Sequence, residues 1–177
     1  HGFLGRAPGF ALSRRLPGPP RPLPPPDRGP LRMVMFTCLP EDVDAERGRL
    51  NVEAQQALAL EAWGEAIAAG RVALRMPDDG RFATLAALVG EFDPHVLFLF
   101  AHGKFYPPAP HEPGRPAYAT VQFEGDDGRG EEIDDRQLAE VFSGSGIRAV
   151  VLSACESGMG DSAELTAGLV WRLSAAG

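Results

Sequence analysis

Three long apolar runs, separated by helical patterns, constrain the fold of this chain more than any other feature. They are LRMVMFTCL at 31–39, HVLFLFA at 95–101 and IRAVVLSA at 147–154, and a shorter run, RVALRM, occupies 71–76. Strands that are apolar at nearly every position and alternate with helices are typical of a parallel sheet covered on both faces. The sequence therefore predicts an α/β fold.

Two helices are predicted between these runs. The segment 51–70 has Asn51 as its predicted N-cap and Gly70 as its predicted stop, with Leu60, Trp63 and Ile67 on one face. The segment 81–92 carries an apolar stripe at helical spacing, made of Phe82, Leu85, Val89 and Phe92.

The second half of the chain continues the alternation after an irregular segment at 106–131. Within 117–133 the sequence favours a β-hairpin, with GDDG as its turn. The segment 133–142 opens with a predicted capping box of Asp134 and Gln137, with Ile133 packing against Leu138. A last helix is predicted at 161–173, opened by Asp161 and Glu164.

Residues 1–30 differ from the rest, because they contain nine of the 17 prolines. Proline fixes φ and removes a backbone donor, so this segment is predicted to be an extended, polyproline-like lead-in. We interpret it as a linker, with a proline-rich ligand for a partner domain as the alternative. The remaining 31–177 is expected to form one domain.

Composition excludes several functional classes. The net charge of −7 argues against a duplex nucleic-acid partner. No apolar run approaches the ~18–20 residues that span a bilayer, and the N-terminus has no signal-peptide pattern, so no membrane association is expected. Two cysteines, Cys38 and Cys155, make no disulfide framework and indicate a reducing compartment, most simply the cytoplasm.

Two of the predicted strands end on residues that can do chemistry. The run at 95–101 leads into His102 and Gly103, and the run at 147–154 leads into Cys155. Sites in parallel sheets form outside the carboxyl ends of the strands. An imidazole can take the proton of a nearby thiol and so activate it as a nucleophile. Backbone N–H groups of Gly103 and of the glycine-rich turn after Cys155 are candidates for an oxyanion hole.

Each of these residues also has a simpler interpretation. A lone cysteine at a strand end is more often a small buried hydrophobic residue, and a lone histidine is more often structural. The joint arrangement favours a site, since both residues end predicted parallel strands and glycines follow both. Cys38 lacks this glycine context and precedes Pro40, so we assign it to the core. His95, His102, His111 and Cys155 show no spacing typical of zinc, and no metal is expected.

The segments VVLSACESG and FLFAHGKF together resemble the CHAT domain, a caspase-like cysteine peptidase family related to caspases and separase. Members carry a strand ending in His-Gly and a later strand close to V-V-L-S-A-C-x-S/T-G. The lead-in GFLGRAPGFALSRRL, the strand LRMVMF and the helix NVEAQQAL also match the family's pattern.

This resemblance implies a caspase-like three-layer sandwich, with a mostly parallel sheet, His102 as general base and Cys155 as nucleophile. Family members usually sit beside TPR or other helical repeats, and some act in bacterial defence. Family domains continue past the cysteine with a further strand and helix, whereas this chain stops at Gly177. We therefore expect a domain truncated at its C-terminus, so that a parent protein can be active where this piece is not.

The predicted function is a cysteine endopeptidase that acts on a protein or peptide through an acyl-enzyme, without a cofactor. One alternative is a catalytically silent caspase-like scaffold or protein-binding module, and another is a thioesterase that uses the same dyad. For the substrate, Glu156 and Asp161 just after the nucleophile favour an arginine or lysine before the scissile bond. Asp126 and Asp127 are further candidates, while helix capping is the simpler role for Asp161.

Overall fold

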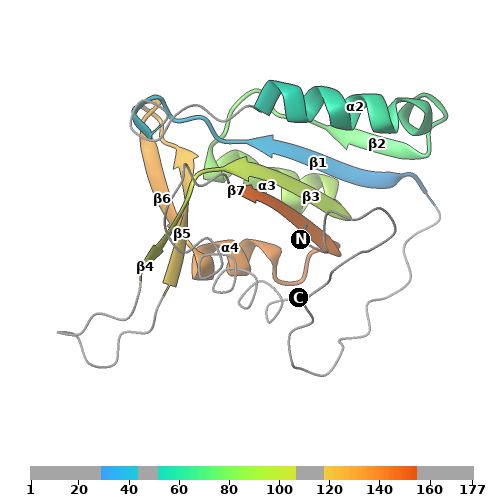
Figure 1. Ribbon diagram of the computed structural model, residues 1–177. Helices are drawn as coiled ribbons and strands as arrows, with labels where there is room; N and C mark the ends of the chain where they lie inside the picture. Colours follow the sequence, from blue (N-terminus) through green and yellow to red (C-terminus); the bar gives the residue numbers. More distant parts are fainter. Residues whose placement is uncertain (1–28, 44–51, 107–117, 155–177) are drawn as a thin grey trace, which may run out of the picture.

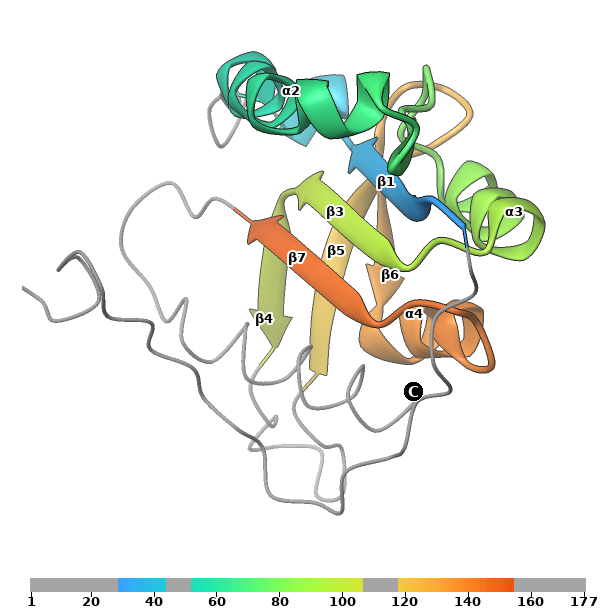
Figure 2. The ribbon, with the colours of Figure 1, turned by 90° about the vertical axis from the view of Figure 1, so that its right-hand side faces the viewer.

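The computed structural model describes residues 29–43, 52–106 and 118–154, which form two sheets and the helices that pack against them. The first sheet is parallel, with strand order β2-β1-β3-β7. Its strands are β1 (Leu31–Thr37), β2 (Val72–Arg75), β3 (Val96–Ala101) and β7 (Ala149–Ala154). All of their carboxyl ends therefore meet at one edge, as the arrowheads of β1, β3 and β7 show in Figure 2.

Helices cover both faces of this sheet, as the sequence predicted. Helix α2 (Val52–Ala68) lies on one side, and α3 (Phe82–Phe92) and α4 (Asp135–Phe142) contribute to the core on the other side (Figure 1). The mostly parallel sheet with its helices confirms the α/β prediction and is consistent with a caspase-like fold.

The alternation of side chains along β1 and β3 divides the core in two. Val34, Phe36, Leu97, Leu99 and Ala101 pack in one cluster with residues of α3 and α4. The intervening side chains of the same two strands, among them Met35, Phe98 and Phe100, pack in a second cluster with Val52, Ala59 and Trp63 of α2. Both faces of the strands are therefore buried, which explains why their sequences are apolar at nearly every position.

Helix α2 confirms its predicted stop but corrects its predicted face. Gly70 follows the helix with φ of 68°, a left-handed conformation that favours glycine, and its N–H donates to the Ile67 carbonyl. The Trp63 ring lies 4.8 Å from the Phe98 ring, so Trp63 does face the sheet. Leu60 does not belong to this face, since it is 38% exposed and its place is taken by Ala59. The N-cap predicted at Asn51 lies outside the described residues.

The predictions for α3 and α4 are confirmed. Leu85 and Val89 are buried, and Phe82 and Phe92 pack against the same cluster. Helix α4 opens with the predicted capping box: the Asp134 side chain accepts the Gln137 N–H at 2.8 Å, and the Gln137 side chain accepts the Asp134 N–H at 3.1 Å. The helix predicted at 161–173 lies outside the described residues.

The second sheet is antiparallel, with strand order β4-β5-β6. Strands β5 (Tyr118–Glu124) and β6 (Gly130–Asp134) form the predicted hairpin. Strand β4 (Gly103–Tyr106) was not predicted, because GKFY has no run of alternating residues long enough to indicate a strand. Its pairing with β5 supplies partners that the sequence of the segment alone does not reveal.

The tip of this hairpin is fixed to the loops around the carboxyl end of β1. The Glu124 carboxylate accepts the Leu39 N–H at 2.9 Å and the Gly80 N–H at 3.0 Å. Gly80 fits here because it has no side chain. A Cβ at this position would lie 2.5 Å from the Thr37 carbonyl oxygen and 2.8 Å from the Cys38 Cα. Main-chain atoms cannot move away as a flexible side chain would.

We predict opposite effects for two Gly→Ala changes. Gly80→Ala should lower the free energy of unfolding by about 1–3 kcal/mol, because the methyl group overpacks the junction. Gly64→Ala lies at an exposed position of helix α2, where a Cβ would meet nothing within 4 Å, and it should raise the free energy of unfolding by about 0.5–1 kcal/mol. Urea unfolding monitored by circular dichroism measures both, and equal effects of the two changes would contradict this account.

Candidate active site

His102 lies where the two sheets meet. It is the single residue between the end of β3 at Ala101 and the start of β4 at Gly103. The His102 carbonyl accepts the Gln122 N–H at 2.8 Å, which ties this point of the chain to β5. The residue is 1% exposed. Parallel pairing on one side and antiparallel pairing on the other thus hold the His102 backbone in place.

Strand β7 runs beside β3 along its whole length. The register pairs Val96 with Ala149 and continues without interruption to the last pair, Ala101 with Ala154. In the sequence, His102 follows Ala101 directly, and Cys155 follows Ala154 directly. The two strands that lead to His102 and Cys155 are therefore neighbours in the sheet, which is the arrangement that a dyad of these residues requires. Cys155 itself, like Glu156 and Asp161, lies outside the described residues.

Gly103 begins β4 and pairs with Val121 of β5. Its backbone is therefore part of the antiparallel sheet, directly after His102. The oxyanion role predicted for its N–H remains a prediction.

Cys38 is a core residue, as the sequence predicted. It is fully buried, and its N–H donates to the Phe100 carbonyl at 2.8 Å. Burial raises the pKa of the Cys38 thiol well above its usual value, and the negative charge of Glu124 raises it further. A thiol held in its neutral form is a poor nucleophile. Cys38 is therefore not suited to catalysis.

A polar cluster on the antiparallel sheet was missed at the sequence level. The Tyr106 hydroxyl donates to Glu132, whose two carboxylate oxygens lie 2.7 and 2.9 Å away. The Lys104 ammonium lies 3.7 Å from Glu132 and 4.5 Å from the centre of the Tyr106 ring, which stacks on Tyr118 at 4.7 Å. These residues come from all three strands, so only the pairing of the strands brings them together.

The same cluster shifts the pKa values of Tyr106 and Glu132. Burial raises the pKa of Tyr106, and its contact with Glu132 adds to the effect. Burial also acts to raise the pKa of Glu132, but the Tyr106 hydrogen bond and the Lys104 charge outweigh it and hold that pKa below its usual value. Glu132 is the register partner of Gln122 on the neighbouring strand, and the Gln122 N–H donates to the His102 carbonyl. The carboxylate of Glu132 therefore lies on the strand next to the one that binds the candidate base.

Asp126 and Asp127 lie at the exposed tip of the hairpin. Asp126 forms an ion pair with Arg81 at 3.4 Å, and an Asp127 carboxylate oxygen accepts the Arg129 N–H at 3.1 Å. The Glu41 N–H donates to the Gly128 carbonyl, which attaches this turn to the loop after β1. Local partners thus account for both carboxylates.

Within residues 29–43, 52–106 and 118–154, no three His, Cys, Asp or Glu side chains are grouped to hold a metal ion. His95 is buried at the amino edge of the parallel sheet, opposite to the edge where His102 lies. His111 is outside the described residues. A search of the described helices finds none with the length and apolar character required to cross a membrane.

The mostly parallel sheet with helices on both faces makes this an α/β domain whose fold is consistent with that of the caspases. The chain matches the sequence profile of the CHAT domain over residues 13–177, and it belongs to that family. This confirms the resemblance drawn from the sequence motifs. The match begins inside the segment predicted as a lead-in, at residue 13. No curated protein matches the chain.

We predict that Cys38 resists alkylation in the folded protein at neutral pH and reacts only after unfolding. Its raised pKa also sets a direction for stability. Below the usual thiol pKa of about 9 the neutral form is present in both states, so no stability is lost. Above it the unfolded chain ionises Cys38 while the folded chain does not, so stability falls as pH rises.

Iodoacetamide labelling followed by mass spectrometry, with and without urea, checks the first statement. Unfolding of wild type and Cys38→Ala between pH 7 and 10 checks the second, since the extra loss above pH 9 should be absent from the variant. Rapid labelling of Cys38 in the native protein would contradict both.

Proposed function

We propose that this chain is a cysteine endopeptidase domain in which His102 and Cys155 form the catalytic dyad. The observation that supports this most strongly is the register of β3 and β7. Ala101 pairs with Ala154, and the next residues in the two sequences are a histidine and a cysteine. Neighbouring strands are about 4.8 Å apart, which is a separation that a thiol and an imidazole can bridge.

The alternation along the two strands supports the same proposal. Val150 and Leu152 of β7 pack against the cluster that contains Leu97 and Leu99 of β3. The side chains at the alternate positions of β3, Phe98 and Phe100, belong to the face that α2 covers. His102 and Cys155 occupy the positions that would continue this second set along their two strands. Continuation of both strands by one residue would therefore direct the two side chains to the same face.

The dyad would act through an acyl-enzyme. His102 accepts the thiol proton of Cys155, and the thiolate attacks the carbonyl carbon of the scissile peptide bond. The oxyanion that forms is stabilised by backbone N–H groups, for which Gly103 is the first candidate. Collapse of this intermediate breaks the C–N bond, and the leaving amine takes the proton from His102. Water, deprotonated by His102, then hydrolyses the thioester and regenerates the thiol.

The burial of His102 fits such a role. A base in a site with little water keeps its orientation and interacts more strongly with charge that develops nearby. Its backbone is held on both sides, by β3 and by the hydrogen bond from Gln122. The thiol of Cys38, by contrast, is kept neutral by its surroundings, which leaves Cys155 as the chain's candidate nucleophile.

We predict that, in the full-length protein, Cys155→Ala abolishes turnover and His102→Ala lowers kcat by ~10²–10⁴-fold, the usual contribution of general-base catalysis. Cys38→Ala is the matched control, because it removes the other thiol and should leave kcat unchanged. Peptide hydrolysis by each variant, measured alongside circular dichroism, checks this. An unchanged kcat in Cys155→Ala would rule out the dyad.

The same assay separates the rival functions. Cleavage of acyl thioesters but not of peptides would identify a thioesterase. A full-length protein that hydrolyses neither substrate, and whose Cys155 reacts no faster than a free thiol with a peptidyl chloromethyl ketone, would be a scaffold rather than an enzyme.

For the substrate, we propose an arginine or lysine before the scissile bond, bound by Glu156 and Asp161. The support is their closeness to Cys155 in the sequence. We predict that Glu156→Gln or Asp161→Asn lowers kcat/KM for the basic substrate by about 30-fold, the equivalent of ~2 kcal/mol, since the change leaves a desolvated cation without its partner.

A peptide library that varies this one position checks the prediction. The value for a substrate with leucine there is the internal control, and it should change little in either variant. Cleavage after aspartate, with arginine ignored, would contradict the proposed preference.

A further inference from the structure

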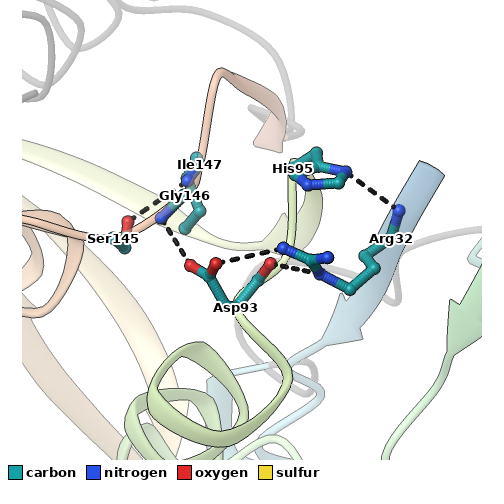
Figure 3. Close-up of polar contacts among 6 residues, drawn as sticks. All are labelled: Arg32, Asp93, His95, Ser145, Gly146 and Ile147. Carbon is teal, nitrogen blue, oxygen red and sulfur yellow. Dashed lines mark hydrogen bonds and ion pairs between the residues drawn. The ribbon is translucent and has the colours of Figure 1, made fainter. Parts of the chain in front are cut away.

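Asp93 joins three segments at the amino edge of the parallel sheet (Figure 3). It ends helix α3 in a left-handed conformation, with φ of 47°, and its N–H donates to the Val89 carbonyl. One carboxylate oxygen accepts the Gly146 N–H at 2.6 Å, and the other accepts a hydrogen bond from Arg32 at 3.0 Å. Its carbonyl accepts a second hydrogen bond from Arg32, at 2.7 Å.

Gly146 belongs to the loop that leads from α4 into β7, and it fits closely against Asp93. A Cβ at this position would lie 2.6 Å from the nearer carboxylate oxygen and 2.9 Å from the carboxylate carbon. Two residues later, the Arg148 N–H donates to the His95 carbonyl at 2.9 Å. The entry to β7 is therefore attached to the entry to β3 by consecutive polar contacts.

The residues that these contacts join are separated in the sequence by the same number of positions as the two residues of the candidate site. Asp93 and Gly146 are 53 residues apart in the sequence. The strand pairs that follow, from Val96 with Ala149 to Ala101 with Ala154, keep the same offset, and so do His102 and Cys155. One register of β7 against β3 therefore fits both the contact at the amino edge and the alignment of the two site residues at the carboxyl edge.

The apolar side chains of the two strands define this register poorly. β3 reads VLFLFA and β7 reads AVVLSA, apolar at nearly every position. A shift of one residue would still bury apolar side chains, yet it would move every side chain of β7 to the opposite face. A shift of two residues would restore the face but displace the strand by about 6.6 Å. Either shift would separate the thiol from the imidazole.

We propose that Asp93 is a positioning residue that sets the register of β7 against β3 and thereby aligns Cys155 with His102. The inference rests on the proposed dyad for its effect on catalysis. The hydrogen bond to Gly146 carries the effect, because Gly146 belongs to the segment that leads into β7. The bonds to Arg32 hold β1 and the end of α3 instead, so they should matter for stability and not for the alignment.

The test compares four variants of the full chain in a Cys38→Ala background, well below their unfolding temperatures. Asp93→Ala removes the acceptor, and Gly146→Ala obstructs it without changing any charge. Asp93→Asn keeps an oxygen that can accept the Gly146 N–H, and Arg32→Met removes only the contacts to β1. We measure kcat per folded molecule and the pH dependence of Cys155 alkylation.

Asp93→Ala and Gly146→Ala should lose at least about 10²-fold in kcat, because a misplacement of about 1 Å can already cost that much and a register shift moves the thiol further. The alkylation pKa of Cys155 should rise in both toward that of a free thiol. Asp93→Asn should retain most of the activity, and Arg32→Met should lose stability while kcat and the alkylation profile stay as in wild type. Wild-type kcat in folded Asp93→Ala and Gly146→Ala would overturn the proposal.

A readout that does not depend on catalysis separates this proposal from the proposed function. Cross-strand NMR contacts between the backbone protons of Leu99 and Leu152, which are register partners, report the alignment directly. Loss of these contacts in both alanine variants supports the role of Asp93 even if the wild type hydrolyses nothing, a result that would contradict only the peptidase. Retention of the contacts in both alanine variants overturns the role of Asp93.

Discussion

The parallel pairing of β3 with β7 is the interaction on which the rest of this structure depends. It joins the first three strands of the sheet to a fourth strand that comes only after a hairpin and a helix in the sequence. Six consecutive pairs, from Val96 with Ala149 to Ala101 with Ala154, fix two segments that are 53 residues apart in the sequence. Parallel strands need such long connections, and the entropy of closing them is recovered through burial of apolar side chains, among them Val150 and Leu152 of β7 against the cluster that contains Leu97 and Leu99.

The second sheet begins directly at the carboxyl edge of the parallel sheet. The chain leaves the parallel sheet at His102 and enters β4 at once, so one residue belongs to the border of both sheets. The hairpin then returns to the loops around β1 through Glu124, whose carboxylate binds two backbone N–H groups. The buried His102 stands between two residues whose strands are paired, Ala101 with Ala154 and Gly103 with Val121, and its own carbonyl accepts the Gln122 N–H. This rigidity suits a group that must be preorganised for chemistry.

The two cysteines show how surroundings decide the chemistry of one residue type. Cys38 follows β1 and is enclosed by the core, where burial and Glu124 keep its thiol neutral. Cys155 follows β7, the strand whose partner leads to an imidazole. A thiol becomes reactive through its neighbours, so the nucleophilic role that we propose for Cys155 and not for Cys38 depends on their different positions in the sheet.

The sequence alone determined the elements of the parallel sheet and its helices, because burial on both faces requires apolar runs and helical spacing leaves a stripe such as Leu85 and Val89. The capping box at Asp134 and the hairpin were equally visible, since both depend on residues close in the sequence. The motifs around His102 and Cys155 also identified the family.

Only the tertiary structure decided which strands are neighbours and in what register. It showed that β4 pairs with β5, that Ala59 rather than Leu60 faces the sheet, and that Asp93 binds Gly146. It also assembled Lys104, Tyr106 and Glu132 from two separate strands. These contacts join residues far apart in the chain, and the pattern of any one segment does not specify its partner, because apolar strands can pair in several ways and polar side chains gain partners only once the strands have paired.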